Sequence, residues 1–127
     1  MKEHMTLQYK IECLHDVAVV GCSGRLVRGA ALDEFRERLE RIEGLRVLVL
    51  DLTEVDLIDA GGLSTMLLLR CWAAQRGVNV KLVNPTTFVR RVLEATHLAS
   101  VFEIASLQEA LCILRAPLGP APNYAAA

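Results

Sequence analysis

The sequence predicts an α/β fold with a mixed, mainly parallel sheet of four or five strands and about four helices. The first observation is that short β-branched runs alternate with longer apolar patterns of helical spacing. The second is an opening pair of strand-like segments joined by a short turn, which is typical of an antiparallel hairpin. Strands that alternate with helices form parallel sheets. A hairpin ahead of such a series makes the sheet mixed.

The opening hairpin consists of residues 6–13 and 17–22. The second segment is a continuous β-branched run, and Ser23 and Gly24 are expected to end it. The first segment alternates loosely, and its apolar side chains on one face are Leu7, Tyr9, Ile11 and Cys13.

A helix is predicted over residues 30–43, where Gly44 ends it. The apolar run at 46–52 has the length of a strand and lies between two helices, which indicates a buried parallel strand. The inner face of the helix is formed by residues at helical spacing, namely Leu32, Phe35, Leu39 and Ile42.

The second helix is predicted over residues 62–76, with Gly77 after its end. Leu68, Leu69 and Trp72 fall outside its expected core stripe, so the helix is apolar nearly all round. Such a helix is either buried within the domain or docks a partner or a second copy, and Trp is a favoured interface anchor. The expected core stripe is Leu63, Met66, Leu67, Cys71 and Ala74.

The last third of the chain continues the alternation with strands at 78–83 and 101–104. Asn84 is expected to cap the helix between them. Ser106 opens a final helix through a capping box. The Pro/Ala-rich tail from 116 to 127 is expected to be disordered, which leaves 1–115 as a single domain. The inner face of the third helix is predicted to be Phe88, Val89, Val92 and Leu93.

The composition favours a soluble cytoplasmic protein that binds no nucleic acid and no cofactor. Hydrophobic residues make up 53% of the 127 residues, and the net charge is −1 with no basic stripe. No signal peptide and no membrane-length apolar run are visible. The spacing of the cysteines matches no metal or redox motif, so they are expected to be buried and reduced: Cys13, Cys22, Cys71 and Cys112.

Catalytic residues are not predicted. No histidine lies beside a Ser or Cys in a nucleophile arrangement, and no phosphate-binding glycine motif is present. Asp51, at the end of the strand predicted at 46–52, forms a small acidic group with Asp56, which is expected in a polar turn, and Asp59. Metal-dependent α/β enzymes place carboxylates at this end of a strand. A metal-dependent enzyme built on these three residues is therefore kept as a weak alternative.

The segment 51–69 (DLTEVDLIDAGGLSTMLLL) resembles the signature of the STAS domain, which occurs in anti-sigma factor antagonists and in the cytoplasmic ends of sulfate transporters. Segments 19–26 (VVGCSGRL), 80–96 (VKLVNPTTFVRRVLEAT) and 98–111 (LASVFEIASLQEAL) also resemble family segments and come in the family's order. The resemblance covers residues 6–115.

The resemblance implies a non-catalytic regulatory module of bacterial partner-switching signalling, which controls transcription. In that family an unphosphorylated antagonist binds an anti-sigma factor that is also a serine kinase, and so frees the sigma factor. Phosphorylation at the third residue of the helix-opening turn breaks the complex, because about two negative charges are placed in the interface.

The turn at 58–63 departs from the family pattern, since its third position is Gly61, which has no hydroxyl. No phosphorylation is expected there, and Ser64 or Thr65 is the alternative phosphosite. Asp59 is expected to cap the helix, and the two glycines permit a tight or positive-φ turn.

The partner is predicted to bind through this turn, the loop at 25–29 and the second helix. Val27 stands where the family carries an acid, so the loop is apolar and basic. The candidate partner-binding residues are Arg25, Val27, Arg28, Asp59, Ala60, Gly61, Gly62, Leu63, Ser64, Leu68 and Trp72.

Two kinds of protein partner fit the resemblance. The first is an anti-sigma factor of the serine-kinase type. The second is a transporter ATPase, because some stand-alone STAS proteins resemble subunits that stabilise phospholipid-transport complexes. Self-association as a homodimer is a further alternative.

Overall fold

A computed structural model of the chain describes residues 6–99 and 102–105. It contains a five-stranded sheet in the order β1-β2-β3-β4-β5, in which β1 is antiparallel to β2 and the other neighbours are parallel. The mixed, mainly parallel sheet expected from the sequence is confirmed. The elements are β1 (Gln8–Leu14), β2 (Val17–Leu26), α1 (Ala30–Glu40), β3 (Val47–Ile58), α2 (Ala60–Gln75), β4 (Asn79–Val83), α3 (Thr87–Ala95) and β5 (Glu103–Ala105).

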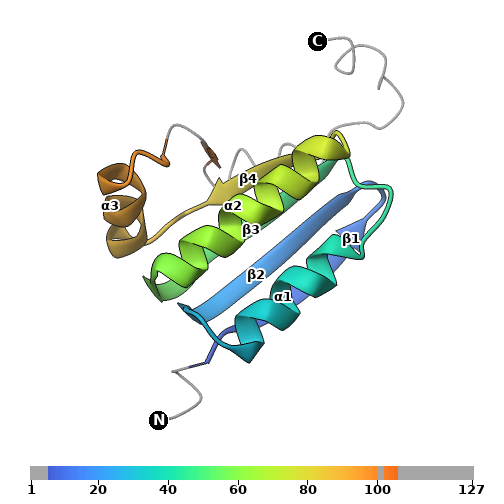
Figure 1. Ribbon diagram of the computed structural model, residues 1–127. Helices are drawn as coiled ribbons and strands as arrows, with labels where there is room; N and C mark the ends of the chain where they lie inside the picture. The colour runs from blue at the N-terminus through green and yellow to red at the C-terminus, as the bar shows by residue number, and fades with distance from the viewer. Residues whose placement is uncertain (1–5, 100–101, 106–127) are drawn as a thin grey trace.

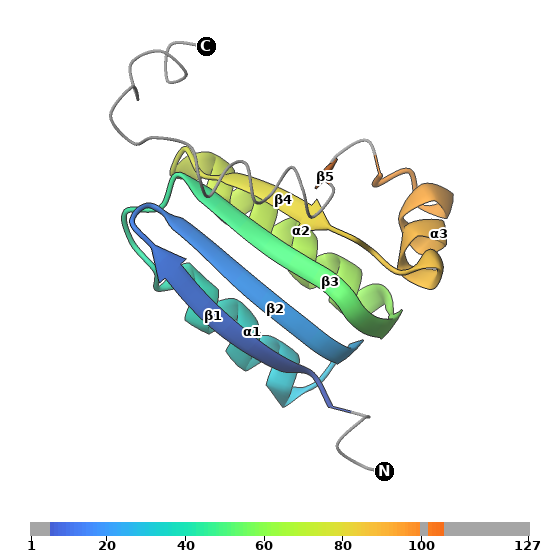
Figure 2. The same ribbon diagram turned by 180° about the vertical axis from the view of Figure 1, so that it is seen from behind.

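The helices α1 and α2 lie side by side across one face of the sheet, and α3 lies near the end of the sheet at which α2 begins (Figure 1). The view from behind shows β1, β2 and β3 in front of these two helices (Figure 2). The three helices of the described region account for three of the four expected. The fourth, predicted from Ser106, and the predicted tail lie outside the described residues.

The core forms on both faces of the sheet because successive side chains of a strand point to opposite faces. Beneath the helices, Phe35 and Leu39 of α1 pack with alternate residues of β2, β3 and β4, including Val20, Leu50 and Leu82. A second cluster uses the intervening positions and consists of Val17, Val47, Val49 and Val83, with Val19 packed against it. Burial on both faces explains why these strands read as continuous apolar runs.

The strands β2 and β3 are both longer than predicted. The expected break at Ser23 and Gly24 is wrong, since β2 continues through Leu26, and β3 continues through Ile58 beyond its predicted end. The pairing of β2 with β3 shifts register between Gly21 and Ser23 and again between Gly24 and Arg25, so the two strands stay paired across residues 23–24. Gly24 has φ +94, and a Cβ there would collide with the Thr6 carbonyl oxygen, so the glycine allows β2 to continue through the register shift at this point.

Three helix details also differ from the predictions. The helix α1 ends at Glu40, before the predicted end, and Gly44 with φ +77 lies in the following loop. The cap of α3 is Thr86 rather than Asn84, because the Thr86 hydroxyl oxygen accepts a hydrogen bond from the Val89 N–H. Phe88, predicted to face inward, is 44% exposed.

The cysteines are only partly as expected. Cys22 is buried and burial raises the pKa of its thiol to about 12, which keeps it protonated. Cys13 and Cys71 are exposed, so their prediction as core residues is wrong, and Cys112 lies outside the described residues. An apolar sequence context did not distinguish the edge strand and the outer helix face from the core.

Candidate partner-binding site

The candidate site is built around Asp59, which follows the last residue of β3 and caps α2. One carboxylate oxygen, Oδ1, accepts a hydrogen bond from the Gly62 N–H at 2.8 Å, as a cap residue does. The other, Oδ2, accepts one from the Arg28 N–H at 3.2 Å, and the Asp59 N–H donates to the Leu26 carbonyl at 3.2 Å. The predicted cap is confirmed, and the same side chain also ties the end of β2 to the start of α2.

Asp59 stays ionised because its charge is bonded on both sides. Burial acts to raise the pKa of its carboxyl group, but the N–H groups of Gly62, Arg28 and Gly61 hold it below its ordinary value, with help from the Arg28 charge. The positive end of the α2 dipole lies at the same point and also favours the carboxylate.

Gly61 and Gly62 bring α2 against the segment that follows β2. A Cβ on Gly61 would lie 2.9 Å from the Arg28 Cβ, and one on Gly62 would overlap the Leu26 carbonyl oxygen and approach Ile58 Cγ1 at 2.8 Å. Neither glycine has a positive φ, so that part of the prediction is wrong. Their role is close approach of the backbone, which any side chain would prevent.

A side chain at position 61 would therefore force Arg28 to shift in this arrangement. Of the two alternative hydroxyls, Ser64 is exposed on the first turns of α2, whereas Thr65 is buried with 6% of its surface exposed. Thr65 is closed to a kinase in this conformation. Ser64 is left as the accessible hydroxyl nearest the turn on α2.

The outer face of α2 carries a ridge of uncharged side chains, and the one charged residue of this helix, Arg70, is exposed as well but is not part of the ridge. We define the outer ridge as Ala60, Ser64, Leu68 and Cys71, which are all exposed and lie three or four residues apart. Leu68 is 51% exposed and is one of the three large hydrophobic side chains exposed in the described region. The candidate residue Leu63 is half-buried beside the ridge and also packs against the core.

Trp72 does not belong to this surface, and its predicted partner-binding role is wrong on this point. Trp72 is 8% exposed and Leu69 is fully buried, so both lie in the core. The Arg76 guanidinium lies 5.3 Å from the centre of the Trp72 ring. The prediction placed Leu69 and Trp72 outside the core because a helix that is apolar all round has no hydrophobic periodicity to show which face is buried. The residues that α2 buries are Gly62, Thr65, Met66, Leu69, Trp72 and Ala73.

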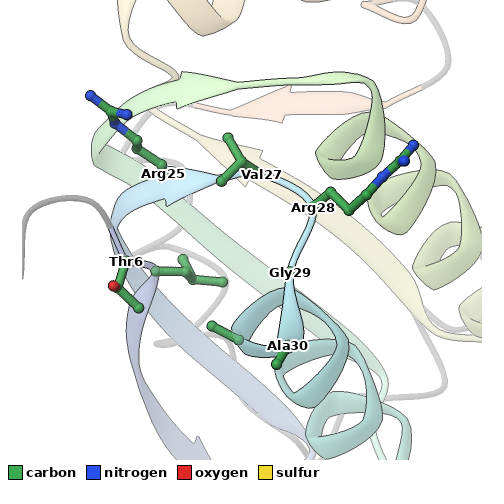
Figure 3. A pocket seen from close by; sticks show the side chains of 8 residues that line it. Thr6, Arg25, Val27, Arg28, Gly29 and Ala30 are labelled. Carbon is green, nitrogen blue, oxygen red and sulfur yellow. The ribbon is translucent and has the colours of Figure 1, made fainter.

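The segment after β2 forms the neighbouring part of the candidate site. Arg25 near the end of β2, and Val27, Arg28 and Gly29 after it, line a pocket of about 240 Å³. The other lining residues come from the segment before β1 and the start of α1: Thr6, Leu7, Ala30 and Ala31. Figure 3 shows the Arg28 side chain extending toward α2 and the Arg25 side chain extending the opposite way, so neither guanidinium points into the pocket. Arg28 therefore places positive charge beside the amino end of α2, whereas the Arg25 side chain extends away from α2.

The three aspartates of the enzyme alternative are engaged separately. Asp51 Oδ1 accepts hydrogen bonds from the Thr53 N–H at 3.0 Å and the Thr53 hydroxyl at 2.6 Å. Asp56 is exposed within β3 rather than in the predicted turn, and Asp59 serves as the cap. Within residues 6–99 and 102–105, no group of three or more His, Cys, Asp or Glu side chains is placed to hold a metal ion.

A family model for the STAS domain matches residues 8–110. The chain belongs to the STAS domain family. The match includes β1 through β5 and therefore all the residues of the candidate site. No curated protein matches the sequence.

Several solved structures share the fold. The unphosphorylated anti-sigma factor antagonist SpoIIAA has a TM-score of 0.69 and 20% identity, with 85% of this chain and 96% of that chain covered. An anti-sigma factor antagonist from Mycobacterium paratuberculosis has a TM-score of 0.66 and 24% identity, with 87% and 96% covered. A sulfate transporter family protein from Wolinella succinogenes has a TM-score of 0.62 and 18% identity, with 79% and 85% covered.

The sequence could not show three contacts of the site: the Arg28 N–H to Asp59, the Leu26 carbonyl to Gly62, and the Thr86 hydroxyl to the Val55 carbonyl at 2.9 Å. The adjacent glycines were the available signal for the second of these contacts. Of the described helices, none is both long and apolar enough to cross a membrane.

Proposed function

We propose that this protein is a non-catalytic, protein-binding regulatory module of the anti-sigma factor antagonist type, which stays in its binding-competent form. The observation that carries the proposal is the packing of Gly61 on Arg28. The residue in the phosphoacceptor position has no hydroxyl, and a Cβ there would lie 2.9 Å from the Arg28 Cβ. A protein that cannot receive phosphate at this position cannot be released from its partner by that charge.

The surface around that position suits a protein partner. The outer ridge offers an uncharged, partly apolar strip, and Arg28 lies near its amino end. Apolar cores with charged rims are typical of protein interfaces. An anti-sigma factor of the serine-kinase type with an acidic rim would match this surface.

Binding through the ridge is tested with Leu68→Asp, because a charge at an exposed position disrupts an apolar contact without disturbing the core. We expect copurification of the native partner to fall at least about tenfold. Phe88→Asp is the matched control, since Phe88 is similarly exposed but lies on α3. Equal loss in both variants, or in neither, would contradict the proposed surface.

The absence of a phospho-switch is tested by incubating the purified protein with the copurified kinase and ATP, followed by mass spectrometry. We expect no phosphate on residues 59–65. Phosphate on Ser64, with a parallel loss of partner binding, would show that phosphorylation controls binding from this position. It would contradict the proposal that the protein always stays in its binding-competent form.

A transporter ATPase is the second candidate partner, and the uncharged ridge favours it as well. A subunit that stabilises an ATPase needs a lasting contact and no signal for release. The exposed Leu68 would contribute to such a contact, and Gly61 has no hydroxyl that could be phosphorylated to release the partner. Identification of the copurified protein distinguishes the two candidates. A kinase-like protein supports the first, and an ATPase with its permease supports the second.

A further inference from the structure

The strand β1 forms one edge of the described sheet, and it lacks most of the features that protect such edges. Of the described strands it pairs with β2 alone, in a register without a bulge. Its seven residues include no proline and no glycine, and five of the side chains are exposed: Gln8, Lys10, Glu12, Cys13 and Leu14. An edge of this length presents unpaired backbone groups that can pair with another strand.

The charges on β1 have opposite signs and share one face of the strand. Lys10 Nζ lies 3.5 Å from Glu12 Oε2, and the two side chains are 81% and 68% exposed. Tyr9 points to the other face, where its ring packs edge-on against Phe35 of α1 at 5.0 Å. A single lysine would protect an edge by repelling an identical lysine. When a glutamate lies two residues from the lysine, however, two copies of the strand can pair in one register that places each lysine opposite a glutamate, and the charges then attract.

That register is the antiparallel pairing of two β1 strands about a two-fold axis through Ile11. Lys10 of each copy then lies opposite Glu12 of the other copy, so two attractive pairs form. A two-fold axis through Lys10 or through Glu12 would instead place like charges opposite each other, which is destabilising. The strand is therefore charge-complementary to itself in one register.

We propose that the protein forms a homodimer in which the β1 strands of two copies pair antiparallel about Ile11 and join the two sheets into one. Leu14 of each copy lies opposite Gln8 of the other, which covers part of a leucine that is 51% exposed in the single chain. Because β2 separates β1 from β3, and α2 begins at the end of β3, the outer ridge of each copy stays open. The dimer presents two partner-binding surfaces, which favours bivalent partners.

A charge-swap cycle tests the register, measured as the dimer dissociation constant of the full chain by sedimentation. Lys10→Glu and Glu12→Lys each turn two attractive pairs into two repulsive ones, and each is expected to weaken the dimer by about tenfold. The double swap Lys10→Glu with Glu12→Lys restores both pairs and is expected to return the constant to within about threefold of the original. Both residues are exposed, so thermal unfolding serves as the control for an intact fold.

The proposal fails if the protein is monomeric at every concentration reached. It also fails if the double swap is as weak as the single ones, or if none of the swaps changes the constant. These results are independent of the proposed function, which is read from Leu68 on α2.

A cysteine placed on the two-fold axis gives a second measurement. Cα atoms of directly opposed residues in antiparallel strands lie about 4.5–5.5 Å apart, within the range of a disulfide. In a background with Cys13, Cys71 and Cys112 replaced by Ser, we expect Ile11→Cys to form a linked dimer on mild oxidation. Leu14→Cys is the matched control, since that position faces Gln8. Linkage no faster at position 11 than at position 14 would overturn the register.

Discussion

The amino ends of α1 and α2 lie beside each other but are built in different ways. The helix α2 begins at Asp59, whose side chain caps the helix and holds the Arg28 N–H. The helix α1 begins at Gly29, which has φ +156 and makes no side-chain cap. The well-secured end belongs to the helix that carries the outer ridge. The comparison indicates that side-chain hydrogen bonds fix the start of the helix that carries the proposed partner-binding surface, whereas the start of α1 has no such bond.

Gly62→Ala should have the largest effect on this comparison. The added Cβ would overlap the Leu26 carbonyl oxygen and press on Ile58, so α2 would have to move away from β2. We expect a loss of about 3 kcal/mol in the free energy of unfolding, measured by chemical denaturation. Gly21→Ala is the matched control, because a Cβ there would meet nothing within 4 Å. Similar losses in both variants would show that close packing is not the reason for Gly62.

Asp59→Ala should have the next largest effect. It removes the cap of α2 and the hydrogen bond to the Arg28 N–H together, and we expect a loss of about 1–2 kcal/mol in unfolding free energy. Asp56→Ala, at an exposed position of β3, should change it by less than about 0.5 kcal/mol. A loss no larger than that of the control would mean that Asp59 does not fasten the two segments.

Gly29→Ala should cost about 1 kcal/mol, because its φ of +156 disfavours a side chain although the space around it is open. The effect should be confined to the start of α1, as amide hydrogen exchange would show. Faster exchange along α2 as well would indicate that the two helix ends are more strongly coupled than their contacts imply.

The pH dependence of stability should show the smallest effect. The pKa of Asp59 is lowered in the folded chain, so its contribution is fully present above its ordinary value of 3.8 and is lost as the pH falls through the folded value. The difference in unfolding free energy between the native protein and Asp59→Asn should therefore shrink below about pH 4. A constant difference from pH 7 to pH 3 would contradict a stabilising charge. Asp16, whose pKa Arg46 also lowers, would leave some pH dependence in the variant.

The sequence predicted the sheet and the cap but not the faces of α2. Alternation of apolar patterns was sufficient for the succession of strands and helices along the chain, and the position of Asp59 before a helical run was sufficient for its role as a cap. Leu67, Leu68 and Leu69 occupy half-buried, exposed and buried positions in turn, and nothing in their identity separates them. Which face a uniformly apolar helix buries is decided by its tertiary neighbours.

The strand ends were missed for a related reason. The strand was predicted to end at residue 52 because polar residues such as Thr53 and Asp56 are typical of a turn, yet both lie in β3 and are exposed. Backbone pairing with β2 holds this half of the strand, and the Thr86 hydroxyl donates to the Val55 carbonyl on the other side. These are contacts between distant segments, which local sequence patterns do not contain.

The bond from the Arg28 N–H to Asp59 has a kinetic consequence, because it joins residues 31 positions apart in the chain. Contacts of such separation depend on loop closure and on the prior pairing of β2 with β3. The bond should therefore form after the rate-limiting step of folding, and Asp59→Ala should speed unfolding while leaving the folding rate almost unchanged. The amino end of α2 would then be fastened late in folding, so that a partner that binds this surface would select molecules in which β2 and β3 are already paired.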